Sequence, residues 1–175
     1  VRNLLENAKE GVLFLMFNPG TKETLYNKIL EISKSHPKLY IRGILNQEPV
    51  TMGDKIVDLQ KPIKLLDKGV ELKTDYETIL PSALKGKPNW EDESSIGLVR
   101  IHSKVIVIDP FGEKPCVITG SNNMGPKASK SNDDNLNIIL DKKLAEEYAV
   151  NIMSIYNHYH FRFASQLNTN KQYKG

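Results

Sequence analysis

Cysteine and long hydrophobic runs are almost absent from this sequence. Cys116 is the only cysteine among 175 residues, which excludes an intrachain disulfide and a cysteine-rich zinc site. The apolar run Gly11–Phe17 spans seven residues, whereas a membrane-spanning helix needs roughly 20. We therefore expect a soluble protein with no transmembrane segment and no signal peptide in this chain, and the sequence assigns no cellular location.

A strong excess of charge of either sign is also missing. Lys plus Arg number 24 and Asp plus Glu number 21, so the net charge is +3. This balance argues against a histone-like binder but does not exclude a phosphate-containing substrate. With 39% apolar and 26% charged residues, the composition is that of a globular protein. We expect a single domain over residues 1–167 and a frayed polar tail over residues 168–175.

The opening part of the chain alternates between strand-like and helix-like patterns. Gly11–Asn18 is a continuous apolar run ended by Pro19-Gly20, which predicts a strand buried on both faces. Thr21 can cap a following helix that ends before Pro37, and Leu39–Leu45 predicts a second buried strand. A strand–helix–strand unit normally places its strands parallel in one sheet, so the pattern predicts an α/β fold.

The middle of the chain gives weaker signals. Asn46–Asp58 is a polar connection, and Ile63–Leu66 and Val70–Lys73 predict short strands. Pro81–Gly97 is a long polar stretch that contains the only tryptophan, Trp90. Two interpretations stay open for it: an ordinary surface excursion or a loop that lines a substrate site.

The last third is the most regular part. Strands are predicted over Leu98–Ile108, Cys116–Thr119 and Leu136–Leu140. Asp141 can cap a long helix, whose apolar face carries Leu144, Tyr148, Ile152, Ile155 and Tyr159.

Candidate chemistry is concentrated in this third. His102 and Lys104 are two residues apart on a predicted strand, so both side chains should leave the same face. An ammonium group neutralises phosphate oxygens, and an imidazole can attack phosphorus or transfer a proton near neutral pH. The pair therefore predicts a phosphate site.

A short polar segment follows the neighbouring predicted strand. Gly120 lets the backbone approach a ligand closely, while Ser121 and Asn123 offer short polar groups to a phosphate. Further along, Asp133 or Asp134 could accept a hydrogen bond from a histidine and fix its tautomer.

These residues resemble the signature of the phospholipase D superfamily. His102, Lys104 and Asp109 match His-x-Lys-x4-Asp, the segment 120–123 matches Gly-Ser-x-Asn, and Asp134 best matches the family's later acidic residue. One departure is the ten-residue spacing from Asp109 to Gly120, which indicates a longer hairpin turn. The resemblance implies an α-β-α sandwich with a mixed sheet flanked by helices.

The sequence contains its own control for the motif. His36-Pro37-Lys38 is also His-x-Lys, but Gly43 stands where the aspartate should be and no Gly-Ser-x-Asn follows. We interpret it as the end of a helix.

The resemblance also implies a mechanism. Family members bring two motif copies together: one histidine attacks phosphorus and forms a phosphohistidine, and the other protonates the leaving alcohol, with no metal or other cofactor. In this chain His102 would be the nucleophile or the acid. Phosphate would be bound by Lys104 and Asn123 with help from Ser121, Asp134 would orient the histidine, and Asp109, at a turn and facing away, would be structural, as would Gly120.

Only one copy of the motif is present. Either two chains form a homodimer that joins two copies of His102, or the chain is the C-terminal half of a two-motif enzyme; the start at Val1 favours the second. The final segment His158–Phe163 also resembles the end of bacterial phospholipase D-like proteins.

The function predicted first is therefore a phosphodiesterase that acts on phospholipids. The alternatives are a metal-independent, homodimeric endonuclease, which the weak charge disfavours, and a non-catalytic interaction domain of the same fold.

Overall fold

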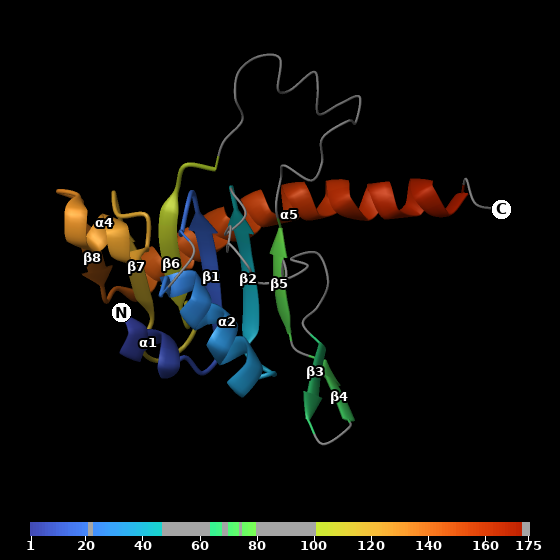
Figure 1. Ribbon diagram of the computed structural model, residues 1–175, viewed down its shortest axis with the longest axis horizontal. Helices are drawn as coiled ribbons and strands as arrows, with labels where there is room; N and C mark the ends of the chain where they lie inside the picture. Colours follow the sequence, from blue (N-terminus) through green and yellow to red (C-terminus); the bar gives the residue numbers. More distant parts are fainter. Residues whose placement is uncertain (21–22, 47–63, 68–69, 74, 80–100, 173–175) are drawn as a thin grey trace, which may run out of the picture.

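A six-stranded sheet organises the computed structural model, which describes the chain outside residues 21–22, 47–63, 68–69, 74, 80–100 and 173–175 (Figure 1). Its strands lie in the order β5-β2-β1-β6-β7-β8, and β3 and β4 form a separate two-stranded sheet. The strand bounds are β1 Gly11–Met16, β2 Tyr40–Leu45, β3 Lys64–Asp67, β4 Val70–Lys73, β5 Tyr76–Ile79, β6 Lys104–Ile108, β7 Cys116–Gly120 and β8 Leu136–Ile139.

The sheet is mixed. Strand β2 pairs parallel with β1 and β5, which confirms the predicted strand–helix–strand unit. The remaining pairs, β1 with β6, β6 with β7 and β7 with β8, are antiparallel. The long turn after Asp109 joins β6 to β7 without disturbing their pairing, because Ile108 still lies opposite Cys116.

Helices cover both faces of this sheet, as the α-β-α prediction requires. Helices α1 (Arg2–Glu6) and α2 (Leu25–Ser35) lie on one face and α5 (Lys142–Gln172) on the other, while α4 (Pro126–Ser131) follows β7 (Figure 1). Along β1, Phe14 and Met16 join the core on the α2 side, whereas Leu13 and Leu15 join the core against α5. This double burial explains the uninterrupted apolar run of that strand.

Several predicted boundaries change. Thr24, not Thr21, caps α2, because its side chain accepts from the backbone N–H of Asn27 in a capping box; Thr21 lies outside the described residues. Asp141 caps α5 as predicted, with its carboxylate 2.7 Å from the N–H of Leu144. Helix α5 then continues to Gln172, so it includes part of the expected polar tail. The sequence patterns did not predict α1, α4 or β5.

The strand predicted from Leu98 begins only at Lys104, so His102 is not on a strand. The last residue pair between β1 and β6 is Met16 with Lys104, and β1 provides no partner beyond it. Instead, the side chain of Asn46 accepts a hydrogen bond from the N–H of Ile101, at 2.9 Å. The Pro81–Gly97 stretch with Trp90 and nearly all of the connection after Asn46 lie outside the described residues.

No helix among the described residues is both long and apolar enough to cross a membrane.

Candidate active site

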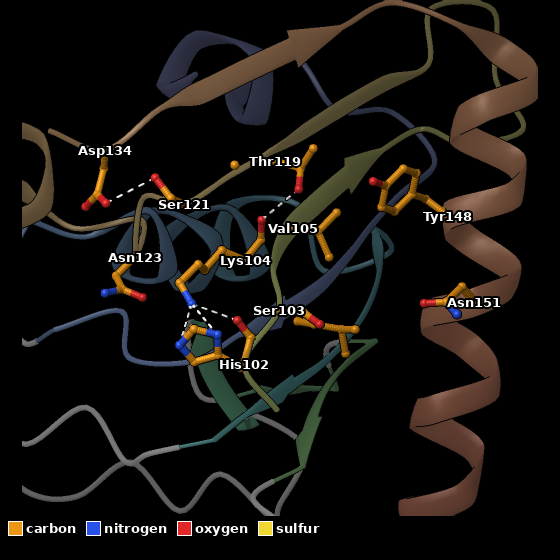
Figure 2. Close-up of a pocket in the computed structure, with 12 residues that line it drawn as sticks. His102, Ser103, Lys104, Val105, Thr119, Ser121, Asn123, Asp134, Tyr148 and Asn151 are labelled. Carbon is orange, nitrogen blue, oxygen red and sulfur yellow. Dashed lines mark hydrogen bonds between the residues drawn. The ribbon is translucent and has the colours of Figure 1, made fainter. Parts of the chain in front are cut away.

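The candidate site lies at one edge of the sheet, where β1 and β7 end and β6 and β8 begin. The register sets this meeting point, because Met16 lies opposite Lys104 and Gly120 lies opposite Leu136. A pocket with a volume of about 580 Å³ opens at this edge (Figure 2). The described residues that line it include all the predicted catalytic ones: His102, Lys104, Ser121, Asn123 and Asp134.

His102 and Lys104 form a compact pair. The Lys104 ammonium lies 3.3 Å from Nδ1 and 3.2 Å from Nε2 of the imidazole, and it donates to the carbonyl oxygen of His102 at 2.7 Å. The side chains of His102 and Lys104 therefore lie together, as their spacing predicted, although His102 precedes the strand. His102 itself is exposed, so its imidazole is accessible to a substrate.

Phe17, the residue after β1, contacts both members of this pair. Its ring centroid is 4.5 Å from that of His102, with an angle of 59° between the planes. The Lys104 ammonium lies 5.0 Å from the centroid of the same ring, within the range of a cation–π interaction.

Lys104 is only 8% exposed, so its ammonium is partly withdrawn from water. This burial lowers the pKa of Lys104, and the charge of Asp134 acts in the opposite direction. A partly desolvated ammonium attracts an anion more strongly than one in bulk water. The side chain is therefore suited to binding a phosphate group.

The backbone at Gly120 has a conformation that favours glycine. Its φ is +154°, and a Cβ atom would lie 2.4 Å from the carbonyl oxygen of Asn135. Asn135 also accepts from the N–H of Ser121 through Oδ1 at 2.7 Å, and it donates its own N–H to the Ser121 hydroxyl at 3.0 Å. These contacts fasten the Gly-Ser segment to the start of β8.

Asn123 lines the pocket through the turn after β7. Its buried Oδ1 has no hydrogen-bond partner within the described part of the chain. The preceding residue fixes the turn, because Asn122 Oδ1 accepts from the N–H of Met124 at 2.8 Å. The amide oxygen only accepts hydrogen bonds, so Asn123 would bind phosphate oxygens through its NH2 group.

Asp134 contacts the Gly-Ser-x-Asn segment rather than the imidazole. It accepts hydrogen bonds from the Ser121 hydroxyl at 3.1 Å and from the Asn132 amide at 3.0 Å. Among the hydrogen bonds of the described residues, none joins Asp134 to His102. The carboxylate therefore acts here on Ser121 and, through its charge, on Lys104.

Comparisons with known proteins show the family of the chain. A family model described as "Cardiolipin synthase, PLD-like domain" matches residues 1–156. The chain belongs to the phospholipase D-like domain family. None of the curated proteins with which it was compared matches it.

Two solved structures show the same fold as this phospholipase D-like chain. NucT from Helicobacter pylori is 18% identical, with a TM-score of 0.57 over 92% of this chain and 85% of that one. Nuc from Salmonella typhimurium, described as a phospholipase D family member, is 16% identical, with a TM-score of 0.51 over 93% and 84% of the two chains.

Asp109 of the phospholipase D-like motif lies outside this pocket, after the far end of β6. Its carboxylate accepts hydrogen bonds from the backbone N–H groups of Lys9, Glu10 and Gly11, at distances of 2.8 to 3.1 Å. Its φ is +47°, and the residue is buried. These contacts tie the start of β1 to the end of β6.

Helix α5 supplies pocket residues that the motif does not include. Tyr148 and Asn151 line the side opposite His102, and Figure 2 shows both side chains facing the strands from the helix. Leu15 and Val105 add apolar surface, and Thr119 adds a hydroxyl group that donates to the carbonyl oxygen of Lys104 at 3.1 Å.

Sequence reasoning found the motif residues of this phospholipase D-like site but missed Phe17, Tyr148 and Asn151. Phe17 continues an apolar run, and Tyr148 falls in an apolar helical pattern, so both resemble core residues. The short distance of Phe17 from Lys104 depends on strand register, which no local pattern reveals. Among the described residues, no group of three His, Cys, Asp or Glu side chains could hold a metal ion.

Proposed function

We propose that the chain hydrolyses phosphodiesters, with His102 in covalent or acid catalysis and Lys104 and Asn123 as the phosphate-binding groups. The observation that carries this proposal is the position of the partly buried Lys104 ammonium against the imidazole, in a pocket that Asn123 also lines. Preorganised donors of this kind stabilise the charge that develops on phosphate oxygens.

The proposed reaction has two steps. A ring nitrogen of one histidine attacks phosphorus and forms a P–N bond, while the P–O bond to the alcohol breaks and a second histidine protonates the departing oxygen. Water then attacks phosphorus with its proton passing to that second histidine, the P–N bond breaks, and a phosphate monoester leaves. His102 takes one of these roles.

The second histidine must come from another copy of the motif, because the chain carries one. Either a second copy of this chain or a further lobe of a longer protein would supply it. The open pocket edge is consistent with both arrangements, since His102 is exposed there.

A phospholipid is the substrate that we propose first. The family model's description names cardiolipin synthase, and the net charge of +3 is small for a protein that tracks a nucleic-acid backbone. The wall formed by Leu15, Val105, Tyr148 and Asn151 would contact one of the two groups esterified to the phosphate.

The direct test incubates the full-length protein with labelled phosphatidylcholine and, separately, with plasmid DNA, both in EDTA. We expect release of the lipid head group. Nicking of the plasmid without lipid cleavage would replace the lipid by nucleic acid as substrate. Absence of both activities in a preparation shown to be folded would favour the non-catalytic interaction domain.

A further inference from the structure

We infer that Phe17 is a positioning residue for both His102 and Lys104, an inference that rests on the proposed function of this pair. One aromatic ring lies 4.5 Å from the imidazole and 5.0 Å from the ammonium, measured from its centroid. The ammonium in turn lies within 3.3 Å of both imidazole nitrogens. The three groups therefore contact one another in pairs.

His102 needs an external support of this kind. It precedes β6, it is exposed, and the N–H of Ile101 just before it donates to the Asn46 side chain. The acidic residue expected to orient it, Asp134, contacts Ser121 instead. Within the described residues, the hydrogen-bonding and ring contacts of the imidazole are those with Lys104 and with the Phe17 ring.

An aromatic ring also suits Lys104 better than a carboxylate would. The negative face of the ring attracts the ammonium but carries no net charge. A carboxylate at this position would neutralise the ammonium and compete with the phosphate for it. The ring therefore holds the ammonium without adding a negative charge beside it.

The fold fixes the position of this ring from both sides. Met16, the residue before it, is held opposite Lys104 by the β1–β6 register. After it, Asn18 accepts from the N–H of Gly20 at 3.2 Å, and the carbonyl oxygen of Pro19 lies close to Gly125, where a Cβ atom would approach it to 2.7 Å. The same turn thus packs against the segment that follows Asn123.

The test compares Phe17→Leu, which keeps an apolar side chain, with Phe17→Tyr, which keeps the ring. Phe111→Leu is the matched control, because Phe111 is 65% exposed in the turn after β6. The first readout needs no turnover: the pKa of Lys104, measured by NMR titration of its side chain in the full-length protein. A cation–π contact favours the charged form, so Phe17→Leu should lower this pKa by about half a unit.

The titratable groups that face Lys104, His102 and Asp134, remain in every variant. Loss of the ring current shifts NMR signals but not a pKa, so the titration reports the ammonium itself. Phe17→Tyr and Phe111→Leu should both keep the wild-type value. If Phe17→Leu fails to fold by circular dichroism, Phe17→Met takes its place in the same measurement.

The second readout is turnover. Phe17→Leu should lower kcat about tenfold with a smaller change in KM, and it should move the alkaline decline of activity to lower pH by about half a unit. Phe17→Tyr should restore both. An unchanged Lys104 pKa in Phe17→Leu would overturn the inference even if the enzyme is active. If the Lys104 pKa shifts in Phe17→Leu but the wild-type protein shows no turnover, the contact is supported and the proposed function is contradicted.

Discussion

At the scale of a residue, Asp109 belongs to the His-x-Lys-x4-Asp motif but lies away from the candidate active site. Strand alternation predicted that it would face away from Lys104 at a turn, and the structure places it there with its carboxylate on three backbone N–H groups. It joins the start of β1 to the end of β6, the two strands whose opposite ends carry Phe17 and Lys104. The motif thus contains both the proposed catalytic pair and a carboxylate that holds the two strands together at their other ends.

Replacement of Asp109 by Asn tests this fastening. Asn tolerates the positive φ of +47° but loses the negative charge and one acceptor oxygen. We expect the free energy of unfolding to fall by about 2 kcal/mol, as for the loss of hydrogen bonds to a buried charged group. Urea denaturation measures it, with Asp133→Asn as control because Asp133 is exposed. An equal midpoint for the two variants would contradict the structural role.

At the scale of an element, the end of one strand and the face of one helix shape the pocket. The sequence predicted β1, β6 and α5 but not the point at which β6 begins, because that point depends on where β1 ends. The sequence also assigned Tyr148 to an apolar helix face. In the structure, this part of α5 contacts both the core and the pocket: Ala149 and Ile152 are buried, while Tyr148 and Asn151 line the cavity. The period of apolar residues predicts which face of a helix is buried, but it does not predict which residues at the border of that face line a pocket.

Replacement of Asn151 by Ala tests the α5 wall. If the wall binds a substrate group remote from the phosphate, KM should rise about fivefold while kcat stays within a factor of two, as for an interaction made equally in the ground and transition states. Asn157→Ala is the control, since Asn157 is exposed on the same helix. Steady-state kinetics on the preferred substrate of the full-length protein give both constants. Matching KM values for the two variants would remove Asn151 from the substrate site.

At the scale of the whole molecule, the α-β-α architecture and the motif residues were predictable, because they rest on local patterns and fixed spacings. The Phe17 contact and the position of Asp134 were not, because they depend on which strand ends meet and on loop hydrogen bonds. The structure joins His102, Lys104 and Asn123 at one open edge and provides half of the proposed two-histidine site. The proposed two-histidine mechanism therefore requires a second copy of the motif.

A chain that carries one histidine of a pair should turn over very slowly as an isolated monomer. We expect activity to rise when light scattering shows a dimer, or in a longer protein that contains a second motif. The measurement follows specific activity against the molar mass determined for the same sample. Robust turnover by a confirmed monomer would contradict the need for a second motif.

The central claim is that phosphodiester cleavage depends on His102, and one pair of variants tests it most directly. His102→Ala and His36→Ala each remove one exposed histidine from a His-x-Lys sequence, but only His102 lies in the pocket. In EDTA and with the full-length protein, His102→Ala should lose more than about 1,000-fold in kcat, while His36→Ala keeps the wild-type rate. Cleavage that survives in His102→Ala would place the reaction elsewhere in the molecule.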